Sequence, residues 1–104
     1  MLQKAIQNEI IRRICRVTKP VKILLFGSYA YGTPTEHSDL DIAVICERVA
    51  SKAKESVRIR RALRGILYSK DIIVTTPEEF DFYSTEPGSV FRTIAEKGIV
   101  LYAG

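Results

Sequence analysis

The sequence has few of the residues that build zinc sites and disulfide frameworks. Its 104 residues include two cysteines and one histidine. Cys15 and Cys46 show no Cys-x-x-Cys spacing and have no histidine cluster near them, so a zinc site is not expected. Both cysteines stand in apolar stretches, which predicts two buried thiols of the kind that suit a reducing cytosol.

Long apolar runs are missing as well. No segment reaches the eighteen or so apolar residues that a membrane span needs. Residues 2–17 show an amphipathic helix pattern that contains Glu9 and Arg12, and this pattern lacks the apolar core of a signal peptide. We therefore expect a soluble protein of the cytoplasm.

Neither sign of charge dominates, and the chain contains no low-complexity segment or internal repeat. The 16 Lys and Arg residues against 12 Asp and Glu residues give a net charge of +4. This charge fits contact with phosphates or an acidic partner, but it is also common among proteins that bind neither. The length is that of one small domain, and no linker is apparent, so a single domain over residues 1–104 is expected.

Hydrophobic periodicity predicts strands that alternate with helices. The predicted helices cover 2–17, 50–67, a segment that begins at the Thr76 N-cap with Pro77 and Glu79, and 88–97, which Gly98 closes. The predicted strands cover 21–26, 40–46 and 71–75, with 99–102 as a terminal strand or tail. This order predicts an α/β fold of the α+β kind, in which helices cover a small mixed sheet.

The predicted helix over 50–67 has an apolar and a basic side. Its inward-facing candidates are Val57, Leu63, Ile66 and Leu67. Its basic residues are Arg58 and Arg61 on one face and Arg60 and Arg64 on another. A solvated helix face accounts most simply for such a run, so a nucleic acid is not an expected partner, although contact with nucleic acid, a protein partner or a triphosphate stays open.

Three acidic residues stand where predicted strands begin. Asp39 and Asp41 are two residues apart at the mouth of the strand 40–46, so their side chains point to one face of the sheet. Adjacent carboxylates repel each other unless a cation neutralises them, and hard oxygen ligands favour magnesium or manganese over zinc. If Asp71 opens a strand that pairs beside 40–46, its carboxylate completes a cluster of three that can carry two metal ions.

A glycine-serine turn supplies the other half of this predicted site. Gly27 and Ser28 follow the strand 21–26 and open a predicted helical turn over 28–32. Glycine lets a phosphate approach closely, and the backbone N–H groups and the Ser28 hydroxyl can donate to it. In this scheme two of the carboxylates, those of Asp39 and Asp41, bridge both metals, while Asp71 binds or deprotonates the attacking hydroxyl.

The motif Gly27-Ser28, ten residues, then Asp39-Leu40-Asp41 resembles the nucleotidyltransferase superfamily of DNA polymerase β and kanamycin nucleotidyltransferase. More narrowly, with the later Asp71, it is similar to the minimal nucleotidyltransferases of prokaryotes, the MntA-like antitoxins. The resemblance implies the nucleotidyltransferase fold and a metal-dependent transfer of a nucleoside monophosphate, usually AMP from ATP, to a hydroxyl. It also implies Mg²⁺, or Mn²⁺, as the cofactor and a HEPN-domain toxin, an RNase, as the partner on which a tyrosine is adenylylated.

Two further hypotheses stay open. A chain of this family can act as a non-catalytic antitoxin that neutralises its partner by occlusion, and a partner or a second copy would then complete the site. A nucleic-acid binder that uses the arginine helix is the third hypothesis. The motif encodes neither the nucleotide base nor the acceptor.

Overall fold

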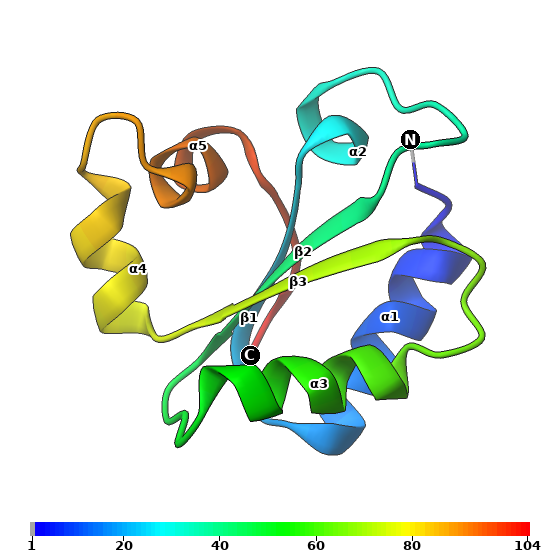
Figure 1. Ribbon diagram of the computed structural model, residues 1–104, viewed down its shortest axis with the longest axis horizontal. Helices are drawn as coiled ribbons and strands as arrows, with labels where there is room; N and C mark the ends of the chain where they lie inside the picture. Colours follow the sequence, from blue (N-terminus) through cyan, green and yellow to red (C-terminus); the bar gives the residue numbers. More distant parts are fainter. Residues whose placement is uncertain (1) are drawn as a thin grey trace.

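The computed structural model describes residues 2–104 and contains a four-stranded sheet with helices on both faces (Figure 1). The helices are α1 (Lys4–Val17), α2 (Ser28–Tyr31), α3 (Lys52–Ala62), α4 (Pro77–Ser84) and α5 (Val90–Lys97). The strands are β1 (Pro20–Phe26), β2 (Leu40–Cys46), β3 (Lys70–Thr75) and β4 (Ile99–Ala103). The predicted mixed α/β architecture is confirmed, and the last segment is a strand rather than a loose tail.

The sheet is mixed, with strand order β3-β2-β1-β4. The central strand β1 pairs antiparallel with both β2 and β4, whereas β2 and β3 run parallel. Parallel neighbours need a crossover connection, and α3 provides it between β2 and β3. The two central strands carry the continuous apolar runs that the sequence predicts for strands covered on both faces.

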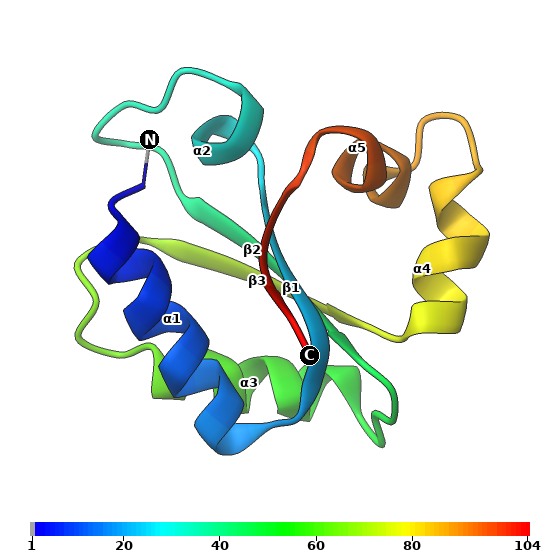
Figure 2. The same cartoon turned by 180° about the vertical axis from the view of Figure 1, so that it is seen from behind.

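Alternate residues of the strands point to opposite faces, and each face has its own pair of helices (Figures 1 and 2). On one side α1 and α3 cover the larger cluster, in which Ile10, Ile14 and Ile59 are fully buried. On the other side α4 and α5 cover a smaller cluster with Ile94 at its centre. We refer to these as the α1/α3 layer and the α4/α5 layer.

Local sequence signals fix where several helices begin. The Ser51 side chain accepts a hydrogen bond from the Lys54 N–H at the start of α3. The Thr76 hydroxyl accepts one from the Glu79 N–H at 3.3 Å, with Pro77 at the first helical position. Both caps satisfy N–H groups that have no partner within the helix, and the second confirms the predicted helix start.

The prediction of a helix over 50–67 is wrong at its C-terminal end. The helix α3 stops at Ala62, and Gly65 follows with a φ of +96°, which a helix cannot contain. Leu63 is buried as predicted and Ile66 is half-buried, but Val57 is 46% exposed and Leu67 is 93% exposed. The predicted inward position of Leu67 requires a helix that continues past Gly65. Because α3 ends at Ala62, Leu67 lies outside the helix and has no buried helix face to join.

The two cysteines differ in burial, which corrects the prediction of two buried thiols. Cys46 lies in β2 and is buried, whereas Cys15 is exposed. In α1 the buried positions are Ile10 and Ile14. Cys15 follows Ile14 by about 100° around the helix, so it points away from the sheet. Within residues 2–104, no helix is both long and apolar enough to cross a bilayer.

Candidate active site

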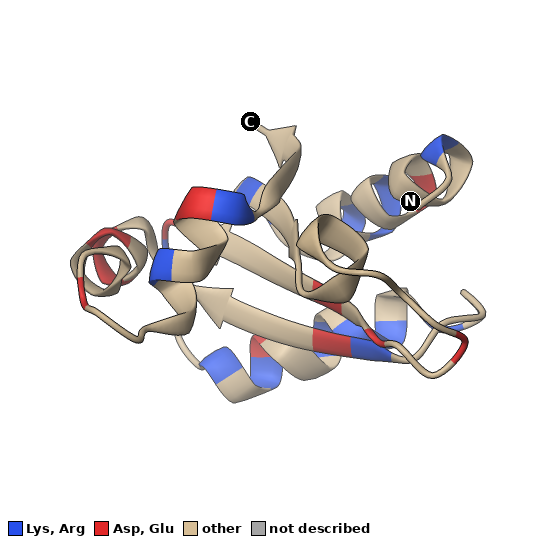
Figure 3. Cartoon of the chain, turned by 90° about the horizontal axis from the view of Figure 1, so that it is seen from above, with Lys and Arg blue, Asp and Glu red and all other residues tan. Residues whose placement is uncertain are grey.

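Asp41 and Asp71 lie opposite each other on neighbouring parallel strands. The register of β2 and β3 pairs Asp41 directly with Asp71, which confirms the predicted pairing of these two segments. Their side chains have the same parity as Ala43 and Ile73, so both project toward the α4/α5 layer. Figure 3 shows acidic bands on two adjacent strands next to the loop that follows α2.

Asp39 directly precedes β2. We refer to Asp39, Asp41 and Asp71 together as the acidic group. The Leu40 N–H donates to the Ser69 carbonyl at 2.8 Å, which ties the entry of β2 to the entry of β3. Burial raises the pKa of Asp41, and the charges of Asp71 and Asp39 raise it further. Asp41 is therefore close enough to both other carboxylates for their negative charges to disfavour its ionised form.

The glycine-serine turn packs against the Asp41 carboxylate. Gly27 follows Phe26, which is opposite Asp41 in the antiparallel pair of β1 and β2. The φ of Gly27 is +74°, and a Cβ atom built there would stand 2.0 Å from Asp41 Oδ2. Only glycine fits this position, because any side chain would both strain the backbone and displace the carboxylate.

The short helix α2 begins at Ser28, directly after this contact. The Gly27 carbonyl accepts hydrogen bonds from the N–H groups of Ala30 and Tyr31, at 3.0 and 3.1 Å. The first N–H groups of a helix have no acceptor within it, and they favour an anion at that end. Tyr29 packs edge-on against Tyr68, with ring centroids 5.8 Å apart, and this contact holds α2 beside the loop that precedes β3.

The donor chemistry of the site suits a hard divalent cation. All three predicted ligands are carboxylates, and hard ions such as Mg²⁺ and Mn²⁺ prefer oxygen. Burial is the main cause of the raised pKa of Asp41, and a bound cation would offset the part that the charges of Asp71 and Asp39 add. Across residues 2–104, however, no three His, Cys, Asp or Glu side chains are arranged to hold a metal ion. The assignment of Asp39, Asp41 and Asp71 as metal ligands therefore stays a prediction.

An open hollow of about 770 Å³ borders the start of β2 and β3, lined by Tyr29, Glu36, His37, Ser38, Leu67, Tyr68 and Ser69. It is not lined by the carboxylates themselves. Ser38 directly precedes Asp39, and Ser69 lies two residues before Asp71. The lining of the hollow is therefore close in sequence to the carboxylates, although the carboxylates do not line it. No sequence signal pointed to Tyr68 or Ser69, because the hollow exists only where two loops distant in sequence meet.

Comparison with solved structures finds the same fold in proteins of low sequence identity. A toxin-antitoxin with AMP-PNP aligns with a TM-score of 0.64 and 23% identity, covering 94% of this chain and 73% of that one. The toxin-antitoxin MntA-HepT aligns at 0.59 and 20% identity, covering 98% and 74%. A candidate nucleotidyltransferase from Sulfolobus solfataricus aligns at 0.61 and 18% identity, covering 99% and 90%.

The family of the chain follows from its sequence rather than from these folds. None of the curated proteins compared with the chain is similar to it. The model of the family described as polymerase beta, nucleotidyltransferase matches residues 8–104, which include the glycine-serine turn and all three aspartates. The chain therefore belongs to the polymerase beta nucleotidyltransferase family, and its four-stranded sheet with flanking helices is the nucleotidyltransferase fold.

Proposed function

We propose that the chain transfers AMP from ATP to a hydroxyl group in a metal-dependent reaction, with Asp39, Asp41 and Asp71 as the catalytic carboxylates. The observation that carries this proposal is the packing of Gly27 against Asp41 Oδ2, with Asp71 directly across the β2–β3 register. It brings an anion-binding turn and an acidic group to the same end of the sheet. In this proposal the turn binds the phosphate oxygens of the triphosphate, and the acidic group binds the cations that accompany it.

The nucleotide end of the site is formed by the turn. Gly27 leaves room for a phosphate close to the backbone, and the Ser28 hydroxyl and the first N–H groups of α2 donate to its oxygens. The Asp41 carboxylate faces this turn, and Asp39 stands two residues before it, so the site carries negative charge as the triphosphate does. Mg²⁺ or Mn²⁺ held by the three carboxylates would neutralise both sets of charge and polarise the α-phosphate.

Asp71 lies on the acceptor side. In the proposed reaction the acceptor oxygen forms a bond to the α-phosphorus while the bond from that phosphorus to the bridging oxygen of pyrophosphate breaks. Asp71 accepts the proton of the attacking hydroxyl, and pyrophosphate leaves with the displaced electron pair. The chain contributes alignment and electrostatic stabilisation to this step, and no covalent enzyme intermediate is required.

The acceptor that we propose is a tyrosine of a helical HEPN-type toxin, so that the chain acts as an antitoxin. The support is the narrower resemblance of the motif around Gly27 and Asp39 to MntA-like antitoxins. The fold is also shared with a toxin-antitoxin solved with AMP-PNP and with MntA-HepT. At 20–23% identity these structures share the fold with this chain, so the partner and the acceptor are part of the proposal.

A labelling experiment tests the reaction. The chain is incubated with α-labelled ATP, Mg²⁺ and a purified HEPN-type toxin, and label transferred to protein is measured. Asp39→Asn/Asp41→Asn should reduce transfer by about 10²-fold or more, because electrostatic stabilisation of the transition state is lost. The matched control is Asp81→Asn, which removes an exposed carboxylate of α4 and should leave transfer unchanged.

The same variants separate catalysis from occlusion. If the double variant still neutralises the toxin fully while the transfer of label is lost, the antitoxin acts by occlusion and transfer is dispensable. If neither the wild type nor the variants label any acceptor, and Mg²⁺-dependent binding of AMP-PNP is also absent by calorimetry, the proposed reaction is excluded.

A further inference from the structure

The charges of the chain are divided between its two helical layers. Residues 1–22 and 47–70, which form α1, α3 and their flanks, hold 14 of the 16 Lys and Arg residues but 3 of the 12 Asp and Glu residues. The remaining residues, which include the candidate active site and the α4/α5 layer, are strongly acidic. Figure 3 shows this separation, with basic bands along α1 and α3.

Two adjoining hollows follow α3. One of about 430 Å³ is lined by Val57, Arg60, Arg61, Arg64, Gly65 and Lys70. The other, of about 400 Å³, is lined by Ala53, Lys54, Val57, Arg58 and Arg61. They share Val57 and Arg61, and every charged residue that lines them is a cation. We call this surface the basic strip: Lys54, Arg58, Arg60, Arg61, Arg64 and Lys70.

Most arginines of the basic strip have no anionic partner. In the part of the chain that the structure describes, Arg60, Arg61 and Arg64 form no ion pair, and Arg58 is the one strip residue that does, with Glu55 at 3.3 Å. Neighbouring like charges repel, and this cost is removed when an anion binds between them.

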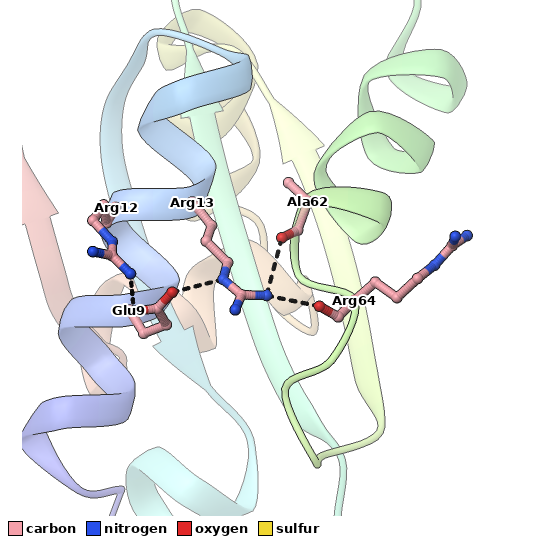
Figure 4. A network of polar contacts seen from close by, with 5 residues as sticks. All are labelled: Glu9, Arg12, Arg13, Ala62 and Arg64. Atoms are coloured by element: carbon pink, nitrogen blue, oxygen red, sulfur yellow. Dashed lines mark hydrogen bonds and ion pairs between the residues drawn. The ribbon is translucent and has the colours of Figure 1, made fainter.

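The acidic residues of α1 and α3 are already paired with arginines. Glu9 of α1 is already bound by Arg12 and Arg13 (Figure 4). Arg13 in turn donates to the Arg64 carbonyl at 2.7 Å, which brings a further cation to the end of α3. Because Glu9 is occupied and Glu55 is paired with Arg58, the exposed side chains of Arg60, Arg61 and Arg64 face solvent without an ion-pair partner among the described residues.

We propose that the basic strip binds the phosphate backbone of a nucleic acid, without reading its bases. The guanidinium group presents a planar fork of donors that matches phosphate oxygens. A protein partner fits less well, because protein interfaces are built around an apolar or aromatic centre. Among the described residues that line the two hollows, Val57 is the one large apolar side chain that is exposed, whereas the exposed aromatic residues lie elsewhere, Phe82 and Tyr83 on α4 and Tyr31 on α2.

The basic strip is separate from the candidate active site. Ile59 and Leu63 bury one side of α3 against the sheet face that carries Ile42 and Val44, whereas Asp41 projects from the opposite face. The proposal therefore goes beyond nucleotidyl transfer and does not depend on it. A variant without the aspartates should keep its affinity for nucleic acid.

Salt dependence measures this binding directly. Fluorescence anisotropy follows the full chain on labelled single-stranded RNA, single-stranded DNA and duplex DNA of the same length. For about four phosphate contacts on a single strand, the slope of log Kobs against log[salt] should be about −3, so affinity falls about 50-fold between 50 and 200 mM salt. Arg60→Ala/Arg61→Ala should leave about two phosphate contacts. The slope of log Kobs against log[salt] should then be about −1.4, and affinity should fall only about 7-fold over the same salt range.

Matched variants keep the test falsifiable. Arg92→Ala/Lys97→Ala removes the same charge from α5 and should leave affinity and slope unchanged. Arg60→Lys/Arg61→Lys should restore most of the salt slope, because charge is kept. Absence of binding at about 50 mM salt, an equal loss in the α5 variant, or tighter binding of poly-glutamate than of any nucleic acid would overturn the proposal, the last in favour of an acidic protein partner.

Discussion

The α1/α3 layer and the α4/α5 layer cover the same sheet but are built differently. The first buries Ile10 and Ile14 from one helix and Ile59 from the other completely, whereas α4 buries no residue and α5 buries only Ile94. Burial of apolar surface is the main source of stability, so the α1/α3 layer carries most of it. The carboxylates project from the opposite face, where packing is thinner.

The layers differ in charge as well as in packing. The α1/α3 layer is basic and the active-site side is acidic. The basic face therefore suits an anion directly, whereas the proposed nucleotide site on the acidic face would need cations to accept a triphosphate. One small sheet thus carries its densest helix packing on one face and its candidate active site on the other.

The largest expected effect is a loss of stability in the α1/α3 layer. Ile59→Ala should lower the free energy of unfolding by about 2–5 kcal/mol, since it removes a fully buried side chain and leaves a cavity. Val57→Ala on the same helix, at a side chain that is 46% exposed, should change it by no more than about 0.5 kcal/mol. Urea unfolding measures both, and similar losses would contradict the description of this layer as the stable one.

A smaller loss of stability, joined to a loss of function, is expected at the turn. Gly27→Ala should cost about 1–3 kcal/mol and abolish Mg²⁺-dependent binding of AMP-PNP, because the new Cβ displaces the Asp41 carboxylate. Gly88 is a control with a φ of +80° and no atom within 4 Å of a built Cβ. Gly88→Ala should show the backbone cost alone, with nucleotide binding intact by calorimetry.

The two sides should also respond to pH in opposite directions, first through Glu9. Hydrogen bonds from Arg12 and then Arg13 lower the pKa of Glu9 to about 2 from 4.5. Ionised Glu9 therefore stabilises the fold above pH 4.5, and this contribution is lost as the pH falls toward 2. Glu9→Gln should lower the melting temperature at neutral pH and converge with the wild type near pH 2. Glu36→Gln, at an exposed residue, should follow the wild type throughout.

The smallest effect is expected at Asp41 and has the reverse sign. Its pKa is raised from 3.8 by burial and by the charges of Asp71 and Asp39. Stability is then greatest while Asp41 is protonated, and it falls as the pH rises through the folded-state pKa. Asp41→Asn should therefore raise the melting temperature at neutral pH in a chelating buffer, and added Mg²⁺ should narrow the difference. An unchanged or lower melting temperature would show that neither burial nor the neighbouring charges disfavour the ionised form of Asp41.

Local patterns predicted the secondary structure well wherever they coincide with the tertiary contacts. The strands 40–46 and 71–75 and the cap at Thr76 were confirmed, because apolar runs and capping residues act over a few residues. The prediction for Leu67 is wrong because the helix ends before Gly65, so the helical periodicity does not continue to residue 67. The prediction for Cys15 is wrong because apolar neighbours in the sequence do not by themselves indicate burial. Burial depends on which helix face meets the sheet, and the apolar character of the neighbours does not fix that face.

The candidate site and the pairing of 71–75 beside 40–46 were predicted from the sequence, but the exact register and the contact of Gly27 with Asp41 were not. The spacing from Gly27 to Asp39 indicated the turn and the first carboxylates. That Asp71 is in register with Asp41 required the parallel pairing of β2 and β3. The hollow beside Tyr68 and the isolation of Arg60 and Arg61 from acids had no counterpart in the sequence pattern.

Short-range patterns in the sequence were enough to indicate most of the helices and strands, the family and the candidate site residues, because capping, periodicity and motif spacing act over a few residues. Which side chains meet depends on the folded chain: Gly27 against Asp41, Asp41 beside Asp71, and a basic layer on the face opposite an acidic one. Contacts and electric fields act through space rather than along the chain. These contacts and fields are fixed only when strands that are distant in sequence form pairs and each helix packs one of its faces against the core.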